Sequence, residues 1–174
     1  MNFRDLTASD IEVRVQSVKK NGLILLLYKN ARVDMSILDE TIGAENWQRE
    51  HYECKGNLFC RVGIKCDGEW VWKADCGVES NTEAQKGEAS DSFKRACFNW
   101  GIGRELYTAP FVWIPADRCN IADGRCYDKF SVEKVVVTDK RITAISILND
   151  SIKSNKIADK RVFVWMEDKD EAAV

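Results

Sequence analysis

The sequence predicts an α+β protein in which an antiparallel β-sheet packs against a long helix. Short segments of alternating apolar and polar residues are separated by tight-turn sequences at residues 55–57 and 67–68, a pattern typical of antiparallel strands. Further along, apolar residues recur at spacings of three and four over residues 89–100, which is the period of an amphipathic helix. Together these two patterns indicate a sheet and a helix that share one apolar core.

The first part of the chain predicts a hairpin, a helix and a meander. Residues 11–18 and 23–28 have strand character and flank a turn at residues 20–22 that contains Asn-Gly. Apolar residues at helical spacing over residues 31–42 then predict a helix that ends at Gly43. Three strands follow, over residues 47–54, 58–66 and 70–76.

A long helix follows the third strand. Ser80 and Glu83 are three residues apart and predict a capping box, in which the hydroxyl and the carboxylate each satisfy an unpaired backbone donor. An apolar stripe continues from Ala89 to Trp100, and two glycines directly after it predict the end of the helix.

The C-terminal part predicts further strands. A short strand is expected over residues 111–114, an irregular connection over 115–128, a hairpin from strands 132–137 and 142–148, and a final strand over 161–166. These strands either extend the sheet or contact a neighbouring subunit, and periodicity does not distinguish the two roles.

Length and composition predict one compact domain spanning residues 1–174. Within it we expect a core at about 8–115, an extension with a hairpin at about 116–166 and an acidic tail at 167–174. The chain has no apolar run long enough to span a bilayer, and its first residues lack the hydrophobic centre of a signal peptide. We therefore expect a soluble, cytoplasmic protein without a membrane partner.

The seven cysteines include no C-x-x-C pair and predict reduced thiols. Cys60 and Cys66 fall on the apolar face of their strand and are interpreted as core residues. A single histidine and scattered thiols argue against a structural metal. Cys119 and Cys126 form the one cysteine pair that merits inspection.

The residues of common enzyme sites are missing. His51 has no G-x-S-x-G context, and no G-x-x-x-x-G-K-[ST] segment provides a phosphate cradle. The nearest enzymatic alternative is a metal-dependent nuclease built on Asp67, Glu69, Lys73 and Asp75. Glu69 and Lys73 would be roughly 13 Å apart along a strand, too far to share one metal-bound water. We therefore expect no catalytic residue and no cofactor.

Lys94 and Arg95 are adjacent at the edge of the predicted helical stripe. Cations fixed on a rigid helix hold two neighbouring phosphates at a set separation and lose less conformational freedom on binding than cations on a loop. Asp91 precedes them by three and four positions, so the same cations also fit ordinary ion pairs on a helix surface. Spacing alone leaves both interpretations open.

Arg61 and Lys65 alternate with the apolar residues of their strand and should project from the face opposite the core. There they either line a groove for nucleic acid or merely solvate an open sheet face. The tryptophans are interpreted mainly as core residues, because Trp70 and Trp72 share one strand face and Trp100 continues the helical stripe. A base-stacking platform is the alternative.

Two segments resemble a known family. The run DSFKRACFNWGIGREL, residues 91–106, resembles the helix and glycine-rich exit of the Rad52 family of single-strand annealing proteins, particularly its short phage-type (Sak-like) members. The run YKNARVDMSILDETIG, residues 28–43, followed by Trp47, resembles the strand, turn and first core helix of that family. The resemblance covers roughly the first two thirds of the chain. It implies a β-hairpin, a helix and a β-β-β-α annealing core, with extra C-terminal strands.

The resemblance also implies a positively charged groove that holds a DNA single strand. By motif match, the groove residues are the helix pair together with an arginine and a tyrosine of the first hairpin, although the tyrosine could instead pack against the helix. Cations on the central strand and elsewhere in the helix segment complete the set. The candidate DNA-binding residues are Lys94, Arg95, Tyr28, Arg14, Arg61, Lys65, Lys86 and Arg104.

The implied function is ATP-independent binding and annealing of single-stranded DNA in homologous recombination and DNA repair. The net charge of −2 requires the positive charge to be local, and a ring of identical subunits would join the local cations into one track. A phage exonuclease or a single-strand-binding protein is a further expected partner. The alternatives are a passive module that protects DNA or recruits a partner, and an interaction protein that has lost the DNA role.

Overall fold

The computed structural model describes residues 1–78 and 84–167 and divides the chain into two compact units. The helix–sheet unit comprises Met1–Asp5 and Asn30–Arg104, and the six-stranded unit comprises Leu6–Lys29 and Glu105–Val174. All strands that pair within the described residues are antiparallel. The predicted α+β class with antiparallel sheets is therefore confirmed. The description of the chain as a single domain stays a prediction.

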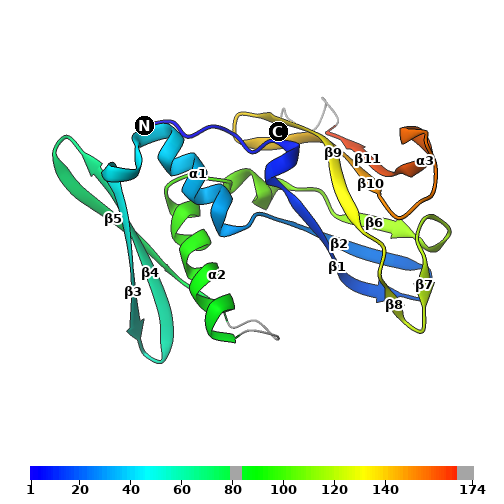
Figure 1. Cartoon of the computed structure of the whole chain (residues 1–174), viewed down its shortest axis with the longest axis horizontal. Helices are drawn as coiled ribbons and strands as arrows, with labels where there is room; N and C mark the ends of the chain where they lie inside the picture. The colour runs from blue at the N-terminus through cyan, green and yellow to red at the C-terminus, as the bar shows by residue number, and fades with distance from the viewer. Residues whose placement is uncertain (79–83, 168–174) are drawn as a thin grey trace. The chain divides into compact units, whose positions relative to one another are not determined.

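The helix–sheet unit contains a three-stranded meander of β3 (Trp47–Cys54), β4 (Asn57–Cys66) and β5 (Glu69–Cys76) (Figure 1). Each end of these strands agrees with the sequence prediction to within one residue. Both connecting turns, at residues 55–56 and 67–68, have positive φ at both positions, between 50° and 90°. Two-residue hairpin turns of the primed type require such angles, so the turn sequences fix the register of the meander.

Helix α1 (Ala31–Ile42) begins and ends where predicted because both of its ends are capped. The Asn30 side-chain oxygen accepts hydrogen bonds from the backbone N–H groups of Arg32 at 2.9 Å and Val33 at 3.4 Å. These bonds satisfy two donors that the first helical turn would otherwise leave unpaired. At the other end Gly43 has a φ of 83°, a conformation that favours a residue without Cβ.

Helix α2 (Ala84–Asn99) contacts β4 and β5 within the helix–sheet unit. Phe93 and Cys97 on its apolar stripe are 0% exposed, as is Val62 on β4. Just beyond the helix, Trp100 donates its indole N–H to the Val62 carbonyl at 3.0 Å. The apolar face of β4 and the stripe of α2 thus form the core of this unit.

The prediction of a core position was wrong for Trp70, which is 40% exposed, while Trp72 is half-buried. The strand register explains the difference, because it places Trp70 opposite Lys65 and Trp72 opposite Gly63. Along β4 these two residues alternate with Val62 and Ile64, whose side chains are buried in the core, so both indoles lie on the opposite sheet face. The Trp72 ring lies against Gly63, where a Cβ would come within 2.9 Å of it.

The six-stranded unit contains one antiparallel sheet in the order β11-β10-β9-β1-β2-β6 (Figure 1). Residue Glu12 of β1 pairs with Ser131 of β9, so the C-terminal strands extend the sheet of the first hairpin. This is one of the two roles that periodicity left open. The strands are β1 (Glu12–Lys19), β2 (Gly22–Tyr28), β6 (Val112–Pro115), β9 (Phe130–Thr138), β10 (Arg141–Asn149) and β11 (Arg161–Met166).

Short elements connect these strands. The segment expected to be irregular, residues 115–128, contains a small hairpin of β7 (Ile121–Ala122) and β8 (Arg125–Cys126). The Asp123-Gly124 turn between these strands was a sequence signal for the small hairpin, because this dipeptide favours two-residue hairpin turns. The other short elements are η1 (Ala8–Asp10), η2 (Ala44–Asn46), η3 (Arg104–Thr108), η4 (Ala116–Arg118) and α3 (Ile157–Lys160). None of the helices in the described ranges is long and apolar enough to cross a membrane.

An ion pair links β9 to β11 across β10. The Arg161 guanidinium donates two hydrogen bonds to the Glu133 carboxylate, from Nε at 2.6 Å and from Nη2 at 2.5 Å. The Ser146 hydroxyl of β10 donates a third bond to this carboxylate at 2.8 Å. The bonds from Arg161 are the main reason that the pKa of Glu133 falls to about 2. The carboxylate is therefore ionised throughout the physiological range.

Candidate nucleic-acid interface

Lys94 and Arg95 lie on α2 beside the buried stripe, and their side chains are 22% and 40% exposed. Their neighbours Phe93 and Ala96 are fully buried against the sheet. The packing of these neighbours fixes the helix backbone and therefore fixes the two points from which the cations project. The pair therefore lies at the edge of the apolar stripe, as predicted.

Both cations have a carboxylate partner. Nε of Arg95 lies 3.3 Å from Oδ1 of Asp75 on β5, and Nζ of Lys94 lies 3.8 Å from Oδ1 of Asp91 one helical turn earlier. The helix-surface ion pair that the spacing left open is thus present for Lys94. All four side chains are partly exposed, and ion pairs in such positions contribute little stability. Replacing either carboxylate with a phosphate group therefore costs little free energy.

The two carboxylates are themselves held by the backbone. Oδ1 of Asp75 accepts a hydrogen bond from the N–H of Cys76 at 2.8 Å, and Oδ2 of Asp91 accepts one from the N–H of Val78 at 3.2 Å. These bonds fix the negative charges close to Lys94 and Arg95. Lys94 and Arg95 therefore lie next to two carboxylates whose positions are fixed by backbone hydrogen bonds.

Arg14 and Tyr28 come together in the six-stranded unit. The Arg14 guanidinium carbon lies 5.5 Å from the centroid of the Tyr28 ring, which is cation–π distance. A hydrogen bond to Glu12, followed by burial, raises the pKa of the Tyr28 phenol, so the hydroxyl stays protonated and donates to that carboxylate. This pair belongs to a different unit from Lys94 and Arg95.

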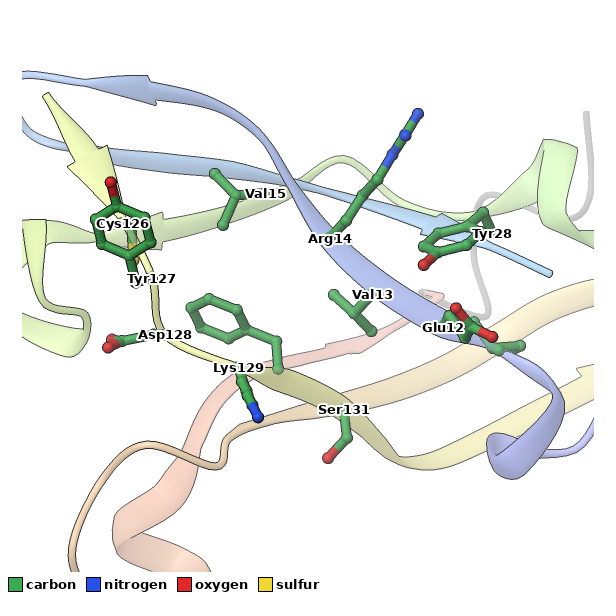
Figure 2. A pocket seen from close by; sticks show the side chains of 12 residues that line it. Glu12, Val13, Arg14, Val15, Tyr28, Cys126, Tyr127, Asp128, Lys129 and Ser131 are labelled. Atoms are coloured by element: carbon green, nitrogen blue, oxygen red, sulfur yellow. The ribbon is translucent and has the colours of Figure 1, made fainter. Parts of the chain in front are cut away.

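Arg14 and Tyr28 also line an open cleft of about 560 Å³ (Figure 2). The other side of this cleft contains Tyr127 and Lys129, which the sequence analysis missed. The available signal was an aromatic residue between two cations in the run Arg125-Cys-Tyr-Asp-Lys129, a composition common in nucleic-acid-binding segments.

Arg61 and Lys65 project from the open face of β4, as predicted, and both are exposed. The guanidinium of Arg61 donates to Glu50 on β3, with Nε at 2.8 Å, and lies 4.5 Å from the ring centroid of Trp72. Lys65 stands opposite the exposed Trp70. Arg61 thus has a structural role on this face.

Arg104 lies just after α2 and caps its C-terminal end. Its Nη2 donates to the carbonyls of Phe98 at 2.8 Å and Asn99 at 3.2 Å. A cation at this position also opposes the negative end of the helix dipole. The side chain of Lys86 and the predicted capping box of Ser80 and Glu83 lie outside the described residues.

The cysteines are free thiols in this structure. Cys60 is buried, and burial raises its pKa to about 11, while Cys66 is only half-buried. Burial, followed by the neighbouring Cys126, raises the pKa of Cys119 to about 11, so these two thiols do lie close together. Within the described parts of the chain, no three His, Cys, Asp or Glu side chains gather in a group able to hold a metal ion.

Comparison with known proteins identifies the family. A family model described as "Rad52/22 family double-strand break repair protein" matches residues 4–119, about two thirds of the chain. No curated protein and no solved structure matches. The match includes α2 with Lys94 and Arg95, as well as the hairpin with Arg14 and Tyr28. The chain therefore belongs to the Rad52/22 family of double-strand break repair proteins, a membership that implies DNA binding and a role in DNA repair and recombination.

Proposed function

We propose that the protein binds single-stranded DNA and anneals complementary strands without ATP. The observation that carries this proposal is the adjacent Lys94–Arg95 pair on a half-buried helix in a member of a double-strand break repair family. Two cations that project from neighbouring, fixed points of a helix can contact neighbouring phosphates of one strand. Arg14 and Tyr28 add a cation and an aromatic ring, the two groups that single-strand binding uses repeatedly.

Annealing of this kind needs no covalent chemistry. Contacts to phosphates neutralise part of the repulsion between two complementary strands and leave their base edges free to pair. Holding the strand in an extended form also removes part of its conformational freedom before pairing begins. The protein then acts as a template, which is why neither a nucleotide nor a metal is part of the proposal.

The net charge of −2 favours an assembly over a single subunit. Two cations bind a strand weakly, and long-range attraction of DNA to a slightly acidic protein is small. A ring of identical subunits would place the same few cations repeatedly along one strand, so that affinity would rise through multivalency. We therefore expect a homo-oligomer in light-scattering measurements, and a strictly monomeric annealing-active protein would contradict this part of the proposal.

The test is fluorescence-monitored annealing of two complementary oligonucleotides, with and without protein, in the absence of nucleotide and metal. We expect acceleration by the wild-type protein and loss of acceleration in the variant with both Lys94→Ala and Arg95→Ala. Alanine keeps the helix, because it has the highest helix propensity. Affinity for single strands should fall about 10- to 30-fold, and the slope of log affinity against log salt should become shallower by about 1.4.

A matched control replaces Lys19 and Lys20, an adjacent pair of exposed lysines at the turn of the β1–β2 hairpin. The variant with both of these changed to Ala has the same change in net charge and should anneal like the wild type. A folded Lys94→Ala, Arg95→Ala variant that binds and anneals normally would remove these residues from the interface. Wild-type binding that slows pairing would instead identify a protective single-strand-binding module.

A further inference from the structure

The cleft next to Arg14 and Tyr28 is formed where two strands of the six-stranded unit separate. β1 and β9 are neighbours in the sheet, yet their register contains a single pair, Glu12 with Ser131. Beyond this pair the strands diverge and the cleft of about 560 Å³ opens between them (Figure 2). Its size lies within the usual range of small-ligand sites.

The floor of the cleft is apolar. Val13 and Val15 of β1 line it, and Figure 2 shows both side chains extending from that strand. Phe130 of β9 lines it as well and is 8% exposed. The flat face of a nucleobase can rest on such a floor, because these three side chains carry no polar atom that would be left unpaired.

Tyr127 gives the cleft its most accessible aromatic ring. It is 78% exposed, although it lines the cleft, and its hydroxyl lies 3.4 Å from Nη1 of Arg125. An aromatic side chain that remains this exposed contributes little to folding, because most of its apolar surface is still in water. The ring can therefore stack on a ligand at no cost to the fold.

Of the four charged side chains that line the cleft, the two cations are exposed and the two carboxylates are half-buried. The Asp128 carboxylate accepts hydrogen bonds from the N–H of Asn120 and from Nδ2 of Asn149, both at 2.8 Å, and Glu12 accepts the hydrogen bond of Tyr28. Both lining carboxylates are thus engaged within the protein. Lys129, which lines the cleft, is exposed, and Arg14 is exposed above the Tyr28 ring.

We propose that this cleft binds one nucleotide of the single strand, with Tyr127 stacked on the base. Lys129 and Arg14 supply the positive charge for the adjoining phosphates. The inference rests on the proposed function and extends it, because Tyr127 and Lys129 lie beyond residue 119, outside the part of the chain that matches the family. The C-terminal strands then lengthen the DNA path that begins at Arg14 and Tyr28.

The test compares Tyr127→Ala with Tyr127→Phe in binding to a short oligothymidine. We expect Tyr127→Ala to weaken binding at least about fivefold and Tyr127→Phe to bind like the wild type, because stacking needs the ring and not the hydroxyl. The salt dependence of Tyr127→Ala should equal that of the wild type, since no cation is removed. Tyr107→Ala is the matched control, because Tyr107 is 65% exposed in the same unit and does not line the cleft.

An oligonucleotide with abasic sites separates stacking from all other effects. It keeps the phosphates and lacks the bases, so the wild type and Tyr127→Ala should bind it equally. If Tyr127→Ala weakens binding to this oligonucleotide as strongly as to oligothymidine, Tyr127 does not stack on a base. If the variant loses self-association while its DNA affinity is unchanged, the cleft is a protein contact and the inference fails.

Failure of the inference is distinguishable from failure of the proposed function. If the wild type binds DNA, Lys94→Ala with Arg95→Ala weakens this binding, and Tyr127→Ala behaves like Tyr107→Ala, then only the nucleotide site is wrong. If the wild type binds no single-stranded DNA, the proposed function itself is wrong and the inference falls with it.

Discussion

Asp75 and Asp91 compete with DNA phosphates for the two cations of α2, so removing their charge should tighten DNA binding. The perturbation is the double variant Asp75→Asn, Asp91→Asn. Asparagine keeps a side-chain oxygen that can accept the backbone hydrogen bonds now made by Cys76 and Val78. The variant therefore removes negative charge from Lys94 and Arg95 without removing the local backbone contacts.

The size of the effect follows from the geometry of the two ion pairs. The N–O distances are 3.3 Å for Arg95–Asp75 and 3.8 Å for Lys94–Asp91, and the four side chains are between 22% and 40% exposed. Pairs with this exposure are worth about 0.2–1 kcal/mol each. DNA binding gives up this energy when phosphates replace the carboxylates, so the double variant should bind about 2- to 30-fold more tightly.

Fluorescence anisotropy with a labelled oligothymidine measures this affinity, and low salt increases the contrast. The matched control is Asp67→Asn, Asp139→Asn, which changes the net charge equally. Both residues lie in turns with φ near 50°, a conformation that asparagine tolerates. The control reports the effect of overall charge alone.

Equal affinity of the double variant and the control would refute the competition. Weaker binding by a correctly folded Asp75→Asn, Asp91→Asn variant would be more serious, because it would mean that the carboxylates position Lys94 and Arg95 for DNA. Circular dichroism and thermal unfolding establish that both variants are folded.

Further predictions concern stability and reactivity. Because Arg161 lowers the pKa of Glu133 from 4.5 to about 2, the stability from this pair is complete above pH 4.5 and is lost as the pH falls toward 2. In urea unfolding, Glu133→Gln should be about 1–2 kcal/mol less stable than wild type at neutral pH, and a difference that persists at pH 2 would contradict the linkage. A thiol reagent at neutral pH should modify exposed Cys54 well before buried Cys60, whose pKa is about 11, and equal rates would show that Cys60 is accessible. Gly22→Ala should cost about 1–3 kcal/mol in thermal unfolding, because its Cβ would stand 2.3 Å from a backbone oxygen of β6, and an unchanged melting temperature would disprove this close approach.

Local sequence signals predicted most of the secondary structure. The meander was predicted to within one residue because its turn sequences accept positive φ, and α1 was predicted at both ends because Asn30 and Gly43 are strong caps. The hairpin β7–β8 was missed because two-residue strands have too few residues to show an alternating pattern, although the Asp123-Gly124 turn was visible.

The orientation of sheet faces was harder to predict. Trp70 was assigned to the core because large apolar residues are usually buried, yet its position opposite Lys65 in the register places it on the open face. The alternation of residues along this strand is the same whichever face of the sheet is buried. Only the packing of α2 against the other face decides which residues are covered.

The sequence by itself determined the elements, their turns and the adjacent Lys94–Arg95 pair, because each depends on contacts between residues close in the chain. Two contacts were decided by the tertiary structure alone. Asp75 lies beside Arg95 although the two are twenty residues apart in the chain, and Tyr127 shares a cleft with Arg14 and Tyr28. Strand order and register bring such distant residues together, and local periodicity carries no information about either. The candidate cations were therefore predictable, whereas their competing anions and the second side of the cleft were not.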